Sequence, residues 1–323
     1  VSSAASDVYM RQDLTPSVTA GIVKENITGI ITETGGTTSH SAILARALEI
    51  PAVLSVEGVA SSLKNGDTVV VDGSEGAVIV NPDDNTVAEY SKKRDAFLAE
   101  RKELENYRGR ETKSASGEAY ELFCNIGKPE DAVKAVDADG EGVGLFRTEF
   151  LFMDRTSIPT EDEQFEAYKK AALILKGKSL IIRTLDIGGD KDIPYLGLEK
   201  EENPFMGFRA IRYCLKNREL FKSQIKAILR ASAFGDIKIM FPLITTMDEL
   251  REGKKLVAEC KADLRNMDIN FNENIQVGVM VETASAAVIA DMLAKEADFF
   301  SIGTNDLTGY TLSLIHISEP TRR

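Results

Sequence analysis

Two kinds of hydrophobic pattern divide this chain of 323 residues, and the change between them falls near residue 88. Before that point, short runs of β-branched residues predict strands, and turn sequences such as Asn65-Gly66-Asp67 separate them. Between the first two runs, apolar residues at helical spacing predict a helix over residues 39–48. The predicted strands are residues 28–32, 51–56, 68–72 and 76–80.

A long charged segment follows over residues 89–111, where 13 of the 23 residues are charged. Tyr90, Phe97 and Leu104 recur every seven residues, which predicts a helix with one narrow apolar stripe. A solvated surface helix and a connector between domains explain this pattern equally well, and we expect the helix to be both.

From residue 117 onwards, apolar strands alternate with amphipathic helices. Capping boxes from Thr160 to Glu163 and from Thr246 to Glu249 mark two of the helix starts. Repeated strand–helix units of this kind predict an α/β fold with a parallel sheet covered by helices. The six predicted strands are residues 120–126, 142–146, 179–184, 237–244, 276–281 and 298–302.

Polar residues follow almost every one of these strands. Any single one of them can be explained as a solvated loop residue or as part of a structural ion pair. In a (β/α)8 barrel, however, the carboxyl ends of all the strands meet at one mouth, where barrel enzymes have their active sites. The convergence therefore favours a TIM barrel, with about six strands present, over an open sheet. The residues are Arg147 and Glu149, Arg183 and Asp186, Glu282, and Asn305 and Asp306.

The residue types in this group indicate a small, phosphorylated, anionic substrate. Arg147, Arg183 and Arg209 carry planar guanidinium groups that fit phosphate and carboxylate oxygens. Glu282 and Asp306 are hard oxygen ligands, suited to Mg²⁺ that is completed by substrate oxygens and water. The net charge of −12 argues against a general nucleic-acid binder, so an anion must be met by these local cations.

Composition also indicates a cellular location. Cys124, Cys214 and Cys260 are widely separated and lie outside any CxxC pattern, so we expect free thiols in a reducing cytoplasm. No apolar run approaches the roughly 18 residues that a membrane-spanning helix needs. We therefore expect a cytoplasmic protein without membrane insertion.

One histidine stands in a context typical of a nucleophile. His40 follows the Gly35-Gly36 turn and falls in the first turn of the predicted helix. The positive end of the helix dipole disfavours an imidazolium, and a nucleophilic histidine must be neutral. A phosphoryl group on His40 would face free backbone N–H groups. A surface or capping histidine is the alternative explanation.

Seven segments, in order along the chain, resemble the phosphoenolpyruvate-utilising enzymes, and among them the enzyme I proteins of the bacterial sugar phosphotransferase system. The resemblance covers roughly residues 8–312. The segments are GGTTSHSAILARALEIPAV, GEGVGLFRTEFLFMDR, RTLDIGGDK, EENPFMGFRAIR, RASAFGDIKIMFP, VGVMVET and FFSIGTNDLTGYT.

This resemblance implies a phosphotransferase that moves a phosphoryl group from phosphoenolpyruvate to His40, and then to a histidine-containing phosphocarrier protein. It implies that Thr19 is a hydrogen-bond partner of the imidazole and that Asn305 helps to bind the substrate carboxylate. It also implies a homodimer formed through the barrel. The other implied roles are phosphoenolpyruvate binding by Arg147, Arg183 and Arg209, and Mg²⁺ binding by Glu282 and Asp306.

The resemblance also divides the chain into four parts. They are a partial phosphohistidine (mobile) domain at 1–88, a linker helix at 89–112, a truncated phosphoenolpyruvate-binding TIM barrel at 113–312, and a tail outside the family pattern, expected to be an artefact, at 313–323. Because the carrier-docking subdomain and the family continuation after Leu312 are missing, we expect a fragment truncated at both ends and inactive on its own. Two alternatives stay open. One is a phosphoenolpyruvate synthase or pyruvate phosphate dikinase-type enzyme, which uses ATP, and the other is a non-catalytic fragment.

Overall fold

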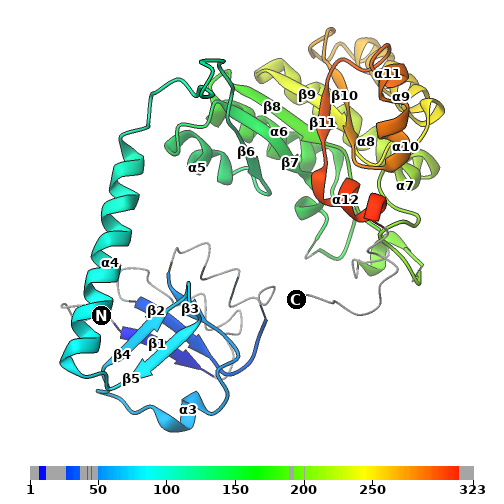
Figure 1. Cartoon of the computed structure of the whole chain (residues 1–323). Helices are drawn as coiled ribbons and strands as arrows, with labels where there is room; N and C mark the ends of the chain where they lie inside the picture. Colours follow the sequence, from blue (N-terminus) through cyan, green and yellow to red (C-terminus); the bar gives the residue numbers. More distant parts are fainter. Residues whose placement is uncertain are drawn as a thin grey trace. The chain divides into compact units, whose positions relative to one another are not determined.

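The computed structural model describes residues 7–11, 27–36, 42, 45, 50–153, 155–188, 193–199 and 201–312. The chain divides into two compact units, Val1–Arg108 and Gly109–Arg323, and each is described by itself (Figure 1). Within the described ranges, every helix is too short or too polar to cross a bilayer.

The first unit contains a three-stranded parallel sheet and an antiparallel strand pair. The sheet consists, in order, of β1 (Asp7–Arg11), β2 (Ile27–Thr32) and β3 (Ala52–Val53), and the pair of β4 (Val69–Asp72) and β5 (Ala77–Val80). The short helix α3 (Val59–Ser62) lies between β3 and β4 in the chain. Ile30 and Ile31 of β2 are completely buried. The four predicted strands are confirmed, and β1 is one that the sequence pattern missed.

The predicted helix of residues 39–48 lies largely outside the described residues. Ala42 and Ala45 are described, and both are helical and buried. They are three residues apart and so share one face of a helix. The apolar residues whose spacing predicted the helix, Ile43, Leu44, Ala47 and Leu48, lie outside the described residues.

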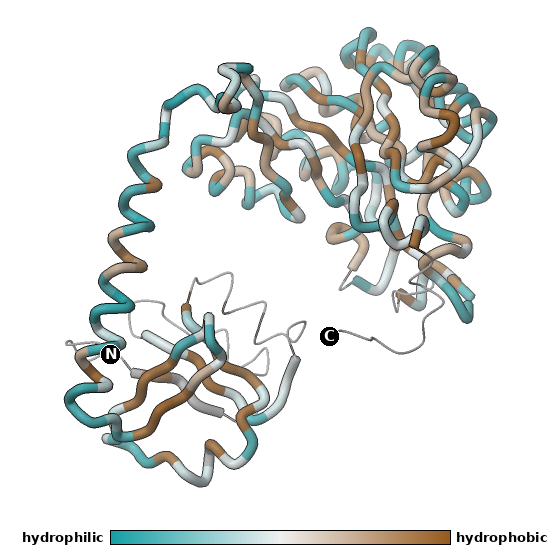
Figure 2. The backbone as a smooth tube through the Cα atoms, viewed as in Figure 1, coloured by the Kyte–Doolittle hydropathy of each residue, from teal (hydrophilic) through white to brown (hydrophobic). Residues whose placement is uncertain are grey.

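Helix α4 (Asp84–Glu105) begins at residue 84 rather than 89 and ends at 105 rather than 111. Its start is fixed by the Asp83 carboxylate, which accepts a hydrogen bond from the Thr86 amide at 2.8 Å. None of its 22 residues, all of which the structure describes, is buried, and Figure 2 shows a largely hydrophilic helix. Phe97 and Leu104 of the predicted stripe are 62% and 63% exposed. A surface helix is therefore confirmed, and its use as a connector stays a prediction.

The second unit contains a curled sheet of parallel strands that follow one another in sequence order (Figure 1). The strands are β6 (Phe123–Ile126), β7 (Gly142–Arg147), β8 (Ser179–Arg183), β9 (Ile237–Phe241), β10 (Val277–Val281) and β11 (Phe300–Ile302). Each strand pairs with the next strand in the chain, in parallel. The predicted α/β fold is confirmed, and the sheet is consistent with part of a TIM barrel.

Helices connect these strands and bury one face of the sheet. They are α5 (Asp131–Asp137), α6 (Glu161–Leu175), α7 (Ile211–Lys216), α8 (Arg218–Ala231), α9 (Met247–Asn266), α10 (Ala284–Val288), α11 (Ala290–Leu293) and α12 (Thr304–Leu312), with the 3₁₀ helices η2 (Thr148–Leu151), η3 (Pro194–Leu196) and η4 (Ser232–Phe234). Both predicted capping boxes are present, at the starts of α6 and α9. Phe146, Tyr168 and Leu180 are completely buried in the core of this unit.

Candidate active site

Charged side chains gather at the carboxyl ends of the parallel strands. Arg147, the last residue of β7, lies opposite Arg183, the last residue of β8, in the strand register. Glu282 follows β10 directly, and Asp306 lies in the first turn of α12, just after β11. The strand ends of a parallel sheet share one edge, so the sheet itself brings these groups together.

Arg183 is held by two carboxylates on neighbouring elements. Its guanidinium forms ion pairs with Glu149 of η2 at 2.7 Å and with Asp186 at 2.9 Å. Burial opposes the charge on Arg183, but Asp186, Glu149 and Glu282 together raise its pKa. Among the described side chains, Arg183 Nε and Glu149 Oε2 are buried atoms without a hydrogen-bond partner. The guanidinium is therefore fixed and charged, and its Nε–H group is available to a ligand.

Arg209 shares Asp186 with Arg183. One of its terminal nitrogens donates to both Asp186 oxygens, at 2.7 and 2.9 Å, and also lies 3.3 Å from Asp306. The guanidinium stacks 5.0 Å from the centre of the Phe205 ring. Arg209 can pack against the backbone of residue 188 because that residue is glycine: a Cβ on Gly188 would lie 2.6 Å from the Cβ of Arg209.

Glu282 is almost fully buried, with 1% of its surface exposed, and accepts a hydrogen bond from the Leu243 amide at 2.6 Å. Burial and repulsion from Asp186 raise the pKa of Glu282 to about 7, although Arg183 opposes the shift. Burial likewise raises the pKa of Asp306, against the pull of Arg209. Gly303 lets α12 start beside Glu282, since a Cβ there would lie 2.7 Å from the Glu282 Cβ. Asp306 is therefore close enough to raise the pKa of Glu282 further.

Negative charge exceeds positive charge in this cluster. Arg183 and Arg209 face four carboxylates, those of Glu149, Asp186, Glu282 and Asp306. An anionic substrate would be repelled unless a cation were added. The hard oxygens of Glu282 and Asp306 fit Mg²⁺. Within the described residues no group of three or more His, Cys, Asp or Glu forms a complete metal cage, so substrate oxygens and water would have to supply the other ligands.

Comparison with known proteins defines the family. The model of the phosphoenolpyruvate-binding domain of PEP-utilising enzymes matches residues 101–317, and that of their mobile domain matches residues 4–76. This chain belongs to the PEP-utilising enzyme family.

Its relatives within that family include phosphoenolpyruvate-protein phosphotransferases. Those of Staphylococcus carnosus and Bacillus subtilis are each 50% identical to it, over 97% of this chain and 55% of the relative. That of Staphylococcus aureus (strain Mu50) is 47% identical over the same shares. The chain thus spans about half the length of the relatives it matches. A solution structure of an Enzyme I (nEIt) protein is 53% identical over 28% of this chain and 37% of that one, with a TM-score of 0.27.

The structure brings together some of the predicted site residues of this family member, but not all of them. Arg183, Arg209, Glu282 and Asp306 form one cluster. Arg147 and Asn305 are solvent-exposed, at the end of β7 and in the first turn of α12. Thr19, His40 and residues 313–323 lie outside the described residues.

Two further carboxylates that contact the cluster had no role in the sequence prediction. Asp186 and Glu149 were recognised only as polar residues after strands, yet they hold the two buried arginines. Their position directly after β8 and β7 was the available signal. Their partners, however, are set by contacts between different strands, which the sequence pattern does not show.

The turn before His40 is described as far as Gly36. Gly35 has a φ of 103°, in the left-handed region that favours glycine. Its carbonyl oxygen accepts a hydrogen bond from the Ser55 hydroxyl at 2.6 Å. The tight Gly-Gly turn that the sequence predicted is therefore consistent with the backbone at Gly35.

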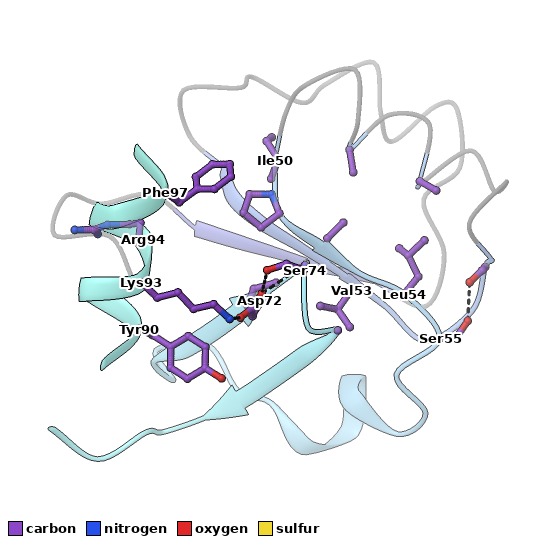
Figure 3. Close-up of a pocket in the computed structure, with 18 of the residues that line it drawn as sticks. Ile50, Val53, Leu54, Ser55, Asp72, Ser74, Tyr90, Lys93, Arg94 and Phe97 are labelled. Carbon is purple, nitrogen blue, oxygen red and sulfur yellow. Dashed lines mark hydrogen bonds and ion pairs between the residues drawn. The ribbon is translucent and has the colours of Figure 1, made fainter. Parts of the chain in front are cut away.

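A cavity of about 930 Å³ adjoins this turn within the first unit (Figure 3). Ile50 and Val53 line one side, and Tyr90 and Phe97 of α4 line another. Gly35 and Gly36 also border it. The cavity therefore lies between part of α4 and the residues around β3.

Two of the side chains that line this cavity, Lys93 and Asp72, attach α4 to β4. The Lys93 ammonium donates to the Asp72 carboxylate at 2.5 Å, and the Ser74 hydroxyl donates to the same carboxylate at 2.6 Å (Figure 3). The Lys93 and Ser74 hydrogen bonds hold the pKa of Asp72 well below its usual range. The ionised carboxylate thus ties α4 to the end of β4.

Proposed function

We propose that this protein transfers a phosphoryl group from phosphoenolpyruvate to His40, and then to a histidine-containing phosphocarrier protein, the first step of the sugar phosphotransferase system. The observation that carries the proposal is the cluster of buried Arg183, Arg209 and Glu282 with half-buried Asp306 at the strand ends of a phosphoenolpyruvate-binding domain. The names of the relatives support it. They give no better support to a synthase or a dikinase.

In this proposal the barrel residues bind and orient the substrate. Arg183 and Arg209 are charged and fixed, so they can bind phosphate and carboxylate oxygens without reorganising. Exposed Arg147 would add a third cation at the mouth, and Asn305 would donate to the carboxylate. Mg²⁺ bound by Glu282 and Asp306 would neutralise charge on the transferring group.

The chemical step forms a bond between an imidazole nitrogen of His40 and phosphorus, and breaks the bond between phosphorus and the enol oxygen. The enol oxygen keeps the bonding electron pair. Enolpyruvate then takes up a proton at carbon to become pyruvate. Thr19 would hold the imidazole in the neutral, nucleophilic form.

Assembly and location extend the proposal. We infer a homodimer formed through the barrel and a cytoplasmic location. The three cysteines, all within the described part of the chain, are unpaired, as is usual in a reducing compartment.

Labelling with ³²P-phosphoenolpyruvate and Mg²⁺ tests the acceptor, in a version of the chain extended to the length of its relatives. We expect an acid-labile, base-stable adduct that His40→Ala removes. Label that persists in His40→Ala would contradict the proposal.

A further inference from the structure

We propose that Gln224 is a positioning residue for the arginine cluster, acting through the backbone that joins Arg183 to Asp186. Gln224 lies on α8 and is completely buried. Its side-chain oxygen accepts a hydrogen bond from the Leu185 amide at 2.9 Å. Leu185 directly precedes Asp186, the carboxylate that both arginines share. The inference rests on the proposed function, because it concerns the residues assigned to phosphoenolpyruvate.

The amide of Gln224 is itself oriented by a buried network. Its nitrogen donates to the Tyr168 hydroxyl at 3.2 Å, and that hydroxyl donates to the Gln164 side-chain oxygen at 3.3 Å. The Gln164 nitrogen donates to the carbonyl of Pro159 at 3.1 Å. Burial strongly raises the pKa of Tyr168, so its hydroxyl stays protonated and able to donate. Each group accepts from one side and donates to the other, which leaves Gln224 one favourable orientation.

The segment that Gln224 holds is fixed at its other end as well. The Thr148 hydroxyl donates to the Arg183 carbonyl at 2.9 Å, and the Thr184 amide donates to the Met240 carbonyl at 3.0 Å. These two contacts come from the neighbouring strand ends, whereas the contact of Gln224 comes from the helix layer. Without it, the Leu185 amide would lose its acceptor in a buried site, and the segment would have to shift to find another.

A shift of the Leu185 backbone would disturb the two arginines, because the adjacent Asp186 contacts both of them. Its carboxylate lies 2.9 Å from one nitrogen of Arg183 and 2.7 Å from one of Arg209. A displacement of the backbone beside it must lengthen at least one of these contacts. A misplacement of about 1 Å in a binding group can cost up to about 100-fold in function.

A comparison of Gln224→Met with Tyr168→Phe separates positioning from stability. Each variant removes two buried hydrogen bonds and roughly keeps the side-chain volume, so both should lower Tm by similar amounts. Only Gln224→Met removes the acceptor for Leu185. In the version of the chain extended to the length of its relatives, we expect it to weaken phosphoenolpyruvate binding in Mg²⁺ by about 10-fold or more, measured by titration calorimetry. Tyr168→Phe should change this binding less than about 3-fold. Gln224→Glu, protonated in this buried site, keeps an acceptor and a donor and should restore most of the affinity.

Hydrogen exchange at the Leu185 amide tests the inference without a ligand. Gln224→Met should speed this exchange by about 10-fold or more, and Tyr168→Phe should have a smaller effect. If the version of the chain extended to the length of its relatives does not bind phosphoenolpyruvate with Gln224 unchanged, the proposed function fails, and the exchange result still decides the role of Gln224. Unchanged exchange in Gln224→Met, or equal losses of affinity in the two variants, would overturn the inference.

Discussion

Replacing Asp186 by Asn should reveal how strongly the cluster depends on one shared carboxylate. Asp186 is 4% exposed at its side chain and pairs with both buried arginines. Removing one partner of a buried ion pair costs about 3–5 kcal/mol, because the remaining charge is left without compensation. Arg183 keeps Glu149 at 2.7 Å, and Arg209 keeps Asp306 at 3.3 Å, so we expect the lower end, about 3 kcal/mol.

Urea unfolding at pH 7, followed by circular dichroism because the chain has no Trp, measures this loss. Glu296→Gln is a surface control, since Glu296 pairs with Arg251 at 2.7 Å in an exposed position, and it should cause no measurable loss. Combining Asp186→Asn with Arg209→Met should cost less than the sum of the two single changes, because the uncompensated charge on Arg209 is then gone.

A free energy of unfolding for Asp186→Asn within about 0.5 kcal/mol of that of the unmodified chain, the range of an ordinary surface substitution, would contradict this prediction. Additive losses from Asp186→Asn and Arg209→Met would contradict it as well, since Asp186 and Arg209 would then not be coupled.

The sequence predicted those parts of the fold whose signals are local. The two capping boxes at Thr160 and Thr246 are complete within four residues, and both are present. The predicted strand at residues 51–56 is shorter in the structure, because Ser55 has a φ of 61°, which is incompatible with an extended strand. β1 carries no run of β-branched residues and becomes a strand only through its pairing with β2.

In the candidate site, too, the sequence predicted the features with local signals and missed the contacts between distant residues. The positions of Arg183, Glu282 and Asp306 after their strands were readable, because a parallel sheet puts all carboxyl ends at one edge. The shared contact of Asp186 and the buried amide of Gln224 join residues 23 and 39 positions apart. Hydrophobic periodicity contains no information on which polar groups meet over such separations, so these partners needed the structure.

Two further predictions concern charge. Because the pKa of Asp72 is depressed in the folded state, its ion pair stabilises the first unit above the unfolded-state pKa of about 3.9, and this stability is lost as pH falls through the folded value. The unmodified chain should therefore have a higher free energy of unfolding than Asp72→Asn at pH 7, measured by urea unfolding, and this difference should decrease below about pH 4. An equal difference at both pH values would contradict the prediction. The second concerns Glu282, a buried carboxylate that Asp186 and Asp306 repel, which Arg183 offsets only in part because the pKa of Glu282 is still raised. Glu282→Gln keeps an oxygen for the Leu243 amide and removes that repulsion, so it should unfold at a higher temperature than the unmodified chain when Mg²⁺ is absent. Mg²⁺ at ten times its Kd should stabilise the unmodified chain by about 1.4 kcal/mol and the variant much less, because the variant has lost one hard ligand. Calorimetric melting with and without Mg²⁺ measures both effects, and an equal Mg²⁺ shift in the two proteins would show that Glu282 is not a metal ligand.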